Sequence, residues 1–334
     1  MPLARYFDLC LSHPEYGYYV TREPFGAAGD FITAPEISQM FGELIGVWCA
    51  AVYQALGAPR RFALVELGPG RGTLMADLLR AAAKAPGFSA AVEVHLVETS
   101  LRLRAVQRET LGSAVHWHDR LETVPEIPAI LVANEFFDAL SLTQLEKRAG
   151  RWFERVAGLD EAGGLCFGLA PDPVPPPLLP SWLSTARDGD IAEISPPRTA
   201  VAATLGARLA RTGGAALLID YGHAAHGFGD TLQAMRAHGF VNPLESPGMA
   251  DLTSHVDFAA LAEAATGAGA AAPPVITQGA YLHAMGIGIR AARLGAPAAA
   301  AVDRLTSDAQ MGKLFKVLCV TGPGLIPPYP FGPA

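Results

Sequence analysis

A glycine-rich run between two predicted elements carries the clearest chemical signal in the chain. Residues 65–74 are Val-Glu-Leu-Gly-Pro-Gly-Arg-Gly-Thr-Leu, which places Gly68, Gly70 and Gly72 in a G-x-G-x-G spacing. Glycines let the backbone come close to a ligand, and the free N–H groups at the start of the following helix can bind it. The run therefore predicts a cofactor-binding loop.

Three classes of protein use such a turn: P-loop proteins, dinucleotide-binding proteins and methyltransferases. No Gly-Lys-Ser/Thr follows, which excludes the P-loop, and the spacing differs from the G-x-G-x-x-G of dinucleotide-binding proteins. Pro69 stiffens the turn. Glu66 would repel a pyrophosphate, but it can accept a hydrogen bond, often through water, from the ammonium group of an amino-acid-bearing cofactor. These features favour S-adenosyl-L-methionine, with S-adenosyl-L-homocysteine as product, over NAD.

Polar residues at the ends of the next two predicted strands extend the candidate cofactor site. Glu98 ends the strand 92–98, and a carboxylate there can bind both ribose hydroxyls of either cofactor. His118 and Asp119 follow the strand 114–117, where an adenine would lie. The alternative for Glu98 is a helix-capping or solvated residue, and for His118 and Asp119 an exposed loop.

Candidate catalytic residues follow the predicted strand 129–134, because strand ends beside the switch point face the cofactor in this architecture. Asn134 and Glu135 are the first candidates and Asp138 is the third. Asn134 is also expected to contact the cofactor. Methyl transfer is an in-line displacement, so holding the nucleophile close and aligned carries much of the catalysis.

An arginine acceptor would need its guanidinium oriented and its charge balanced, which paired carboxylates do through bidentate hydrogen bonds. Glu193 and Glu36 are the candidates for the second carboxylate, and the sequence does not decide between them. Asp220-Tyr221-Gly222-His223 ends another predicted strand and could line the acceptor channel. The alternative for His223 is an ordinary loop histidine.

Strands and helices alternate in the part of the chain that carries these residues, and regular alternation predicts a parallel, doubly wound sheet. A helix over 37–56 comes first, since apolar residues recur at helical spacing and Gly57 and Pro59 end the pattern. The expected strands are 62–67, 92–98, 114–117, 129–134, 215–221 and 315–320, and the expected helices are 73–83, 100–111 and 200–211.

Two segments interrupt the alternation. Residues 141–198 contain a predicted hairpin, 142–146 with 151–156, and then a proline-rich stretch, and residues 222–256 are rich in loops. We interpret both as substrate-facing insertions in one domain that spans 1–334. The small-residue stretches 265–274 and 294–302 are expected to be a loop and a helix.

Composition narrows the class of protein. Half of the residues are hydrophobic, the charged fraction is 17 % and the net charge is −7, which favours a compact globular protein and argues against nucleic acid as partner. The four cysteines form no CxxC pair or Cys/His cluster, so no metal is expected. The N-terminus lacks an apolar signal core, and no stretch approaches a membrane span, which predicts a cytoplasmic location.

Motifs along nearly the whole chain resemble the MidA-like family of class I methyltransferases, which includes the mitochondrial protein arginine methyltransferase that assists assembly of respiratory complex I. The matching stretches occur in order: HPEYGYY (13–19), GDFITAPEISQMFGELIG (29–46), ELGPGRGTL (66–74), ANEFFDAL (133–140), LLIDYGH (217–223), DTLQAMRAHGF (230–240), PGMADLTSHVDF (247–258), TQGAYLHAMGI (277–287) and MGKLFKVL (311–318). Family members usually have proline at the position of Ser141, and they carry an additional N-terminal helix.

The resemblance implies a Rossmann-like fold with a mainly parallel seven-stranded sheet and helices on both faces. It also implies that an N-terminal extension, residues 1–60, folds over S-adenosyl-L-methionine. The extension residues expected at the cofactor are Gly29, Asp30, Phe31, Thr33, Pro35 and Glu36. The alternative is a tight structural turn in which Thr33 or Ser38 caps the next helix.

The implied activity is methylation of arginine side chains in a partner protein, with a respiratory complex I subunit as candidate. The oligomeric state stays open, a dimer being one candidate. Three other functions compete with this one: a small-molecule methyltransferase with 141–198 as a lid, a cofactor-binding assembly factor with little turnover, and an NAD-dependent oxidoreductase.

Overall fold

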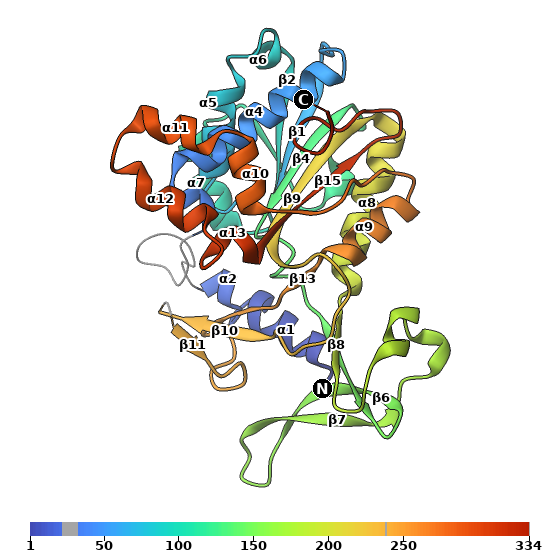
Figure 1. The fold of residues 1–334 in the computed structure, drawn as a ribbon. Coiled ribbons are helices and arrows are strands. Elements are labelled where there is room, and N and C mark those ends of the chain that lie inside the picture. Colours follow the sequence, from blue (N-terminus) through green and yellow to red (C-terminus); the bar gives the residue numbers. More distant parts are fainter. Residues whose placement is uncertain (22–32, 238, 334) are drawn as a thin grey trace.

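A mainly parallel sheet forms the centre of the computed structural model, which describes residues 1–21, 33–237 and 239–333 (Figure 1). Its strand order is β3-β2-β1-β4-β9-β15-β14, and β13 pairs with β9 outside this path. The bounds are β1 Phe62–Leu67, β2 Val92–Val97, β3 Val115–His118, β4 Ala129–Asn134, β9 Gly214–His223, β13 Val256–Asp257, β14 Ile276–Thr277 and β15 Phe315–Thr321. Pairing is parallel from β3 to β9, and β15 is antiparallel to both its neighbours. The seven-strand path confirms the expected fold.

Helices cover both faces of this sheet, as Figure 1 shows. One face packs against α4 (Gln39–Ala55), α5 (Thr73–Ala82), α10 (Gln278–Ala284), α11 (Ile287–Leu294) and α12 (Ala298–Thr306). The other packs against α8 (Pro196–Thr212) and α9 (Phe258–Gly267). Every residue of β1 and β4 is buried, which explains why all but Glu66 and Asn134 in these two strands are apolar. The remaining helices around the sheet are α3 (Ala34–Ile37), α6 (Phe88–Ala91), α7 (Leu101–Leu111) and α13 (Met311–Leu314).

Two smaller antiparallel sheets and the N-terminal helices lie beyond one end of the main sheet (Figure 1). The first sheet, in order β7-β6-β5-β8, comprises β5 Thr143–Arg148, β6 Arg151–Leu159, β7 Leu165–Pro173 and β8 Ile191–Ile194. The second, in order β11-β10-β12, comprises β10 Gln233–Arg236, β11 Gly239–Val241 and β12 Asp251–Thr253. The predicted hairpin is confirmed as β5 and β6, which turn at Ala149 and Gly150, both with positive φ.

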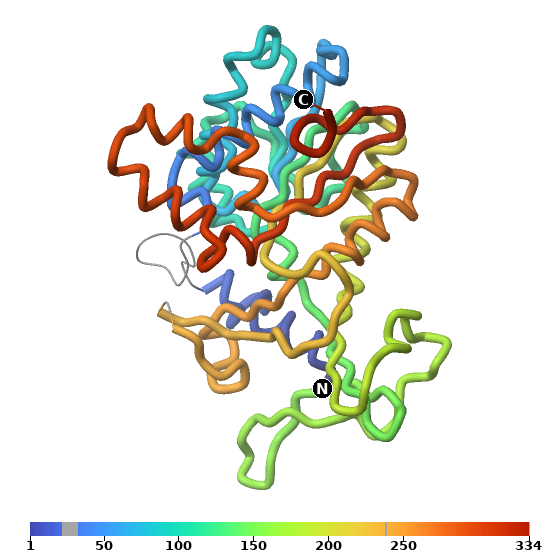
Figure 2. The backbone as a smooth tube through the Cα atoms, in the orientation of Figure 1, coloured from blue at the N-terminus to red at the C-terminus, as the bar shows by residue number. Residues whose placement is uncertain are grey.

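The N-terminal helices α1 (Leu3–Ser12) and α2 (Tyr18–Thr21) pack against both small sheets. Figure 2 shows this N-terminal stretch beside the backbone of β10 and β12, which lies more than two hundred residues away in sequence. Three 3-10 helices, at Leu121–Thr123, Pro176–Leu178 and Ser181–Thr185, complete the described elements. No helix in the described ranges is long and apolar enough to cross a membrane.

Several predicted bounds shift for local reasons. The helix expected over 37–56 begins at Gln39, because Ser38 is extended and its side chain caps the helix by accepting from Met40 N at 3.2 Å. The loop expected over 265–274 begins later than predicted, because α9 continues to Gly267. The helix expected over 294–302 is α12, which starts at Ala298 because Gly295 ends the preceding helix with positive φ.

Candidate active site

The glycine-rich loop connects β1 to α5 at the carboxyl edge of the main sheet. Gly68, Gly70 and Gly72 have φ of 62°, 51° and 83°, a left-handed conformation that glycine adopts without a steric penalty. At Gly68 a Cβ would also lie 2.9 Å from the ring of Phe136. The spacing seen in the sequence is therefore a backbone requirement of this turn.

Glu66 lies beneath the loop with only 3 % of its surface exposed. Within the described part of the chain, its Oε2 atom has no hydrogen-bond partner. Burial raises the pKa of Glu66 to about 8. An unpaired buried carboxyl group is energetically unfavourable, and a cationic ligand group at this point would relieve it. This observation fits the ammonium group of S-adenosyl-L-methionine.

Two adjoining cavities open around the loop. The smaller, about 50 Å³, is lined by Glu66, the glycine loop, Thr73, Leu74 and residues of α3 and of the end of β4. The larger, about 600 Å³, is lined by Glu98, Phe136, Tyr19 and neighbouring residues. Gly68, Gly70 and Glu135 border both cavities, so the two form one continuous site along the carboxyl edge of the sheet.

Residues of the N-terminal extension close one side of the smaller cavity. Thr33, Pro35 and Glu36 line it together with Pro69. The side chain of Glu36 accepts a hydrogen bond from Thr73 Oγ1 at 2.8 Å, which joins α3 to the start of α5. The structure thus brings these predicted residues to the loop. Gly29, Asp30 and Phe31, which were expected beside them, lie outside the described residues.

Glu98 follows β2 and lines the larger cavity, with 9 % of its surface exposed. Its Oε1 accepts from Ser100 N at 2.7 Å. Burial, the largest influence, raises the pKa of Glu98, and the hydrogen bonds from Ser100 and Gln107 oppose that increase. The position fits a carboxylate that accepts from ribose hydroxyls.

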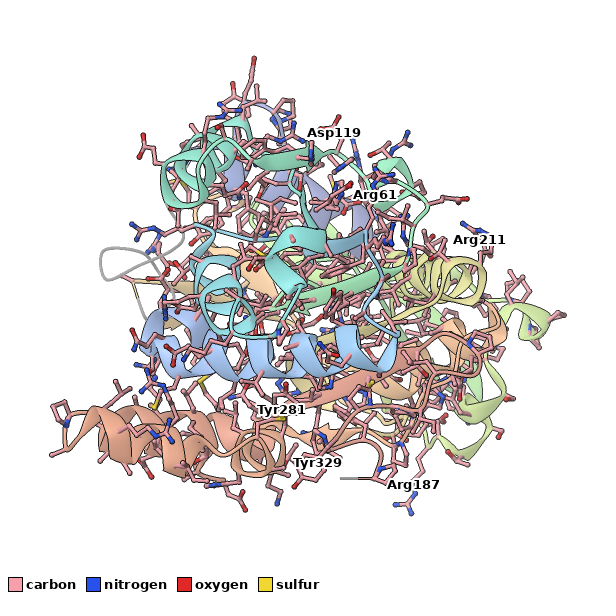
Figure 3. The ribbon with its side chains drawn as sticks, turned by 90° about the horizontal axis from the view of Figure 1, so that it is seen from above. Arg61, Asp119, Arg187, Arg211, Tyr281 and Tyr329 are labelled. Carbon is pink, nitrogen blue, oxygen red and sulfur yellow. The ribbon has the colours of Figure 1, made fainter. Side chains whose placement is uncertain are left out.

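His118 and Asp119 lie away from both cavities, in contrast to the expectation that they border the adenine. His118 still belongs to β3, so the pleat directs its ring toward His95, with 3.0 Å between His118 Nε2 and His95 Nδ1. Asp119 pairs with Arg104 at 2.6 Å, and its side chain is 76 % exposed. Figure 3 shows Asp119 at the periphery of the molecule.

Asn134 and Glu135 lie where β4 ends: Asn134 lines the smaller cavity, and Glu135 borders both cavities. Glu135 has a φ of 50°, an uncommon value for a residue with a side chain. Its Oε1 accepts from Ala34 N and Asn134 Nδ2, each at 3.1 Å. Burial raises the pKa of Glu135 to about 7. The strained backbone therefore holds a readily titrated carboxyl group at the centre of the site.

The chain matches the model of a family described as "Putative S-adenosyl-L-methionine-dependent methyltransferase" over residues 44–276. The match covers well over half of the sequence and includes the loop, Glu98 and Glu135. The chain belongs to this family.

Curated relatives are similar to this methyltransferase over most of their own length. This chain is 36 % identical over 315 residues to "Protein arginine methyltransferase NDUFAF7, mitochondrial" of Danio rerio. The aligned stretch covers 86 % of this chain and 74 % of the relative. The chain is 36 % identical over 369 residues to the Drosophila melanogaster homolog, covering 98 % and 82 %. The names of these relatives call them mitochondrial and thus contradict the expected cytoplasmic location. That prediction is wrong because the lack of a secretory signal core says nothing about other compartments.

Solved structures agree with this assignment. The methyltransferase superimposes with a TM-score of 0.83 on a crystal structure of a Burkholderia thailandensis protein bound to S-adenosyl-homocysteine, at 34 % identity and covering 96 % of this chain and 87 % of that chain. A native crystal structure from the same organism gives a TM-score of 0.81 at 33 % identity, covering 96 % and 87 %. S-adenosyl-L-methionine is thus the cofactor of this methyltransferase.

Asp138, the third predicted catalytic residue, is buried behind the site and lines neither cavity of the methyltransferase. Its Oδ2 accepts from Tyr221 Oη at 2.5 Å. Asp220 Oδ2 accepts from the backbone N of Phe137 and of Asp138, at 3.0 and 3.2 Å. Asp138 and Asp220 therefore fix the turn after β4, and Asp220, which the sequence suggested for the acceptor channel, lines neither cavity.

Glu193 and His223 line a third cavity of about 630 Å³, between the first insertion and the start of α8 and α9. Glu193 Oε1 accepts from Gln144 Nε2 at 2.7 Å and from Thr231 N at 2.9 Å. Neither Glu193 nor His223 borders the cofactor cavities, whereas Glu36 does. Sequence reasoning did not include Tyr19 among the site residues, although its motif HPEYGYY belongs to the family resemblance.

Proposed function

We propose that this methyltransferase transfers the methyl group of S-adenosyl-L-methionine to arginine side chains of a partner protein. The names of the relatives support this acceptor, since they are called protein arginine methyltransferases. A respiratory complex I subunit is the candidate partner, on the resemblance stated above. The position of Glu135 is the observation that carries the proposal, because it places a carboxyl group where the two cavities meet.

Glu135 is suited to bind and deprotonate a guanidinium group. No hydrogen bond reaches its Oε2 from the described residues, so that atom is available to the larger cavity. The bound cofactor supplies the methyl group. As the new N–C bond forms, the sulfonium S–C bond breaks and S-adenosyl-L-homocysteine leaves with the bond electrons. The guanidinium nitrogen loses a proton in the same process, and Glu135 can accept it because its pKa of about 7 matches neutral conditions.

The surroundings of Glu135 support a long, partly apolar acceptor. Phe136, Leu140 and Val20 contribute apolar surface to the larger cavity. Tyr19 lies on the same wall, and its hydroxyl donates to the carboxylate of Asp251 at 3.1 and 3.2 Å, which leaves its lone pairs for a donor in the cavity. We therefore infer that the extension borders the acceptor, and that the second insertion supports this wall from behind through Asp251.

The proposal is tested by comparing arginine peptides with lysine peptides as acceptors and by replacing the Glu135 carboxylate with an amide. Arginine peptides, and the same peptides with lysine in place of arginine, are incubated with methyl-labelled S-adenosyl-L-methionine. Label is expected on the arginine peptides only. Glu135→Gln should reduce the rate by roughly a hundredfold, the usual effect of losing a general base, while the affinity for S-adenosyl-L-homocysteine stays within a few-fold.

The matched control is Glu161→Gln, an exposed carboxylate in the β6–β7 turn, which should leave the rate unchanged. Label on lysine peptides would reject the arginine assignment. Tight binding of S-adenosyl-L-homocysteine without labelling of any arginine peptide or of complex I subunits would favour the assembly factor.

A further inference from the structure

Gln107 on α7 is fully buried between the glycine loop and the strand end that carries Glu98, and the sequence analysis did not select it. Its Nε2 atom donates to Gly70 O at 2.7 Å and approaches Glu98 Oε2 at 3.4 Å. Its Oε1 atom accepts from Trp117 Nε1 at 2.8 Å. One side chain therefore contacts the loop after β1, the end of β2 and strand β3.

The indole of Trp117 fixes the orientation of this amide. An indole N–H can only donate, so the Gln107 oxygen must face Trp117 and the NH₂ group must face the other two contacts. Both of those contacts, Gly70 O and Glu98 Oε2, are acceptors. Every polar atom of the amide thus has a suitable partner, and rotating the amide by half a turn would break all three contacts.

Glu98 is held on both of its oxygens by this arrangement. Oε1 accepts from Ser100 N and Oε2 faces the Gln107 amide, so the carboxylate plane has little rotational freedom. The backbone oxygen of Glu98 accepts from Arg104 Nε at 2.7 Å, which fixes the strand end itself. A carboxylate that binds two vicinal hydroxyls gains affinity when its direction is set before binding.

We propose that Gln107 is a positioning residue for the cofactor, which fixes the Glu98 carboxylate relative to the glycine loop so that the carboxylate meets the adenosyl ribose correctly. The inference rests on the proposed role of Glu98 as the ribose-binding carboxylate. Gln107 itself touches neither cavity, so it acts through its two partners.

Calorimetric titration with S-adenosyl-L-homocysteine tests this inference. Gln107→Leu removes all three contacts and leaves an apolar side chain of similar size in the same buried position. The affinity for S-adenosyl-L-homocysteine should then fall about tenfold. In a Glu98→Ala background the same substitution should change the affinity by less than about twofold, because the effect passes through Glu98. Gln54→Leu, an exposed glutamine on α4, is the matched control and should have no effect.

Measuring the affinity at several pH values distinguishes a positioning role of Gln107 from a general destabilisation of the fold. Loss of the Gln107 hydrogen bond should raise the pKa of Glu98 further, so the deficit in affinity should grow as the pH is lowered toward the range in which carboxyl groups take up protons. A purely structural defect would lower the affinity equally across that range. Trp117→Phe, which removes only the indole donor, should give a smaller loss in the same direction and serves if the leucine variant does not fold.

The outcomes are distinct. Unchanged affinity in Gln107→Leu, or an equal loss with and without Glu98, would overturn the inference while leaving the donor site intact. If wild-type protein binds S-adenosyl-L-homocysteine but Glu98→Ala binds it equally well, the ribose role of Glu98 fails and the inference fails with it. Absence of binding to the wild-type protein would instead reject the cofactor site as a whole.

Discussion

Two carboxyl groups, the buried Glu66 and the partly buried Glu135, face the cavities in which the cofactor and its acceptor are proposed to bind. Burial raises their pKa values to about 8 and about 7, so at neutral pH each holds a proton for a large part of the time. Both groups become fully charged only when a cation arrives: the ammonium group of the cofactor for Glu66, and the guanidinium for Glu135. The site therefore couples ligand binding to proton release.

Binding of S-adenosyl-L-homocysteine should release a proton from Glu66, because the ligand ammonium favours the ionised carboxylate. The affinity should therefore increase as the pH is raised from about 6 to about 8, by up to tenfold per unit. Calorimetry in buffers of different ionisation enthalpy measures the released proton directly. Glu66→Gln should bind about tenfold or more weakly and release no proton from this position. Equal proton release in the variant would contradict this assignment.

In the ligand-free protein, Glu66 and Glu135 should contribute stability that is lost as the pH rises from about 5 to about 8. In the unfolded chain these carboxyl groups ionise near 4.5, whereas folded Glu66 keeps its proton to about 8 and Glu135 to about 7. At these two groups the folded state thus binds more protons in this interval, so raising the pH removes their contribution to stability. Urea denaturation of the wild type and of Glu66→Gln across this range measures that contribution as the difference between the two slopes. Equal slopes would rule out a protonated carboxyl group at Glu66.

At the scale of elements, α8 joins the main sheet to the second insertion through Arg198. This buried side chain donates to Asp138 O at 3.0 Å, to Ser254 Oγ at 2.7 Å and to His255 O at 2.8 Å. The three acceptors belong to the turn after β4 and to the chain between β12 and β13. One helix residue therefore aligns the segment that carries Glu135 with the segment that packs on the N-terminal extension.

Arg198→Leu should lower the free energy of unfolding by about 2–4 kcal/mol, because it leaves buried acceptors without donors. Arg211→Leu on the same helix is the control. Arg211 is 55 % exposed, lies at the periphery in Figure 3 and pairs with exposed Glu126, so its loss should change stability by less than about 1 kcal/mol. Denaturation curves for both variants provide the comparison, and equal effects would show that the Arg198 contacts do not hold the elements together.

Across the whole molecule, the cofactor site is assembled from segments that are distant in sequence. The extension contributes α3, the main sheet contributes the ends of β1, β2 and β4, and β12 supports Tyr19 through Asp251. A ligand in these cavities would contact elements from both parts of the fold shown in Figure 1. Binding should therefore stabilise the molecule as a unit.

A hundredfold excess of S-adenosyl-L-homocysteine over its dissociation constant should add about 2.7 kcal/mol to the free energy of unfolding, and NAD should add nothing. Hydrogen exchange should slow in α3, in the loop 68–72 and around Glu98. Protection confined to the loop and Glu98, with α3 unchanged, would show that the extension does not close over the cofactor. Thermal denaturation and exchange can be followed on the same samples.

The sequence by itself determined the features that depend on local backbone geometry. Three glycines at alternate positions are needed for three positive φ angles in one turn, and continuous apolar runs such as 129–134 are needed for strands covered on both faces. The loop, the alternation of strands and helices, and the positions of Glu66, Glu98 and Glu135 near strand ends follow from these local rules. The motifs along the chain then indicated the family, which the comparisons confirm.

Only the tertiary structure decided where side chains point and which distant groups they meet. His118 follows the pleat of β3 toward His95, Asp138 turns back onto Tyr221, and Glu193 faces a different cavity. The proposed positioning role of Gln107 depends on the packing of α7, which brings its side chain against Gly70 and Glu98. Side-chain direction depends on packing between elements far apart in sequence, and composition and spacing carry no information about such packing.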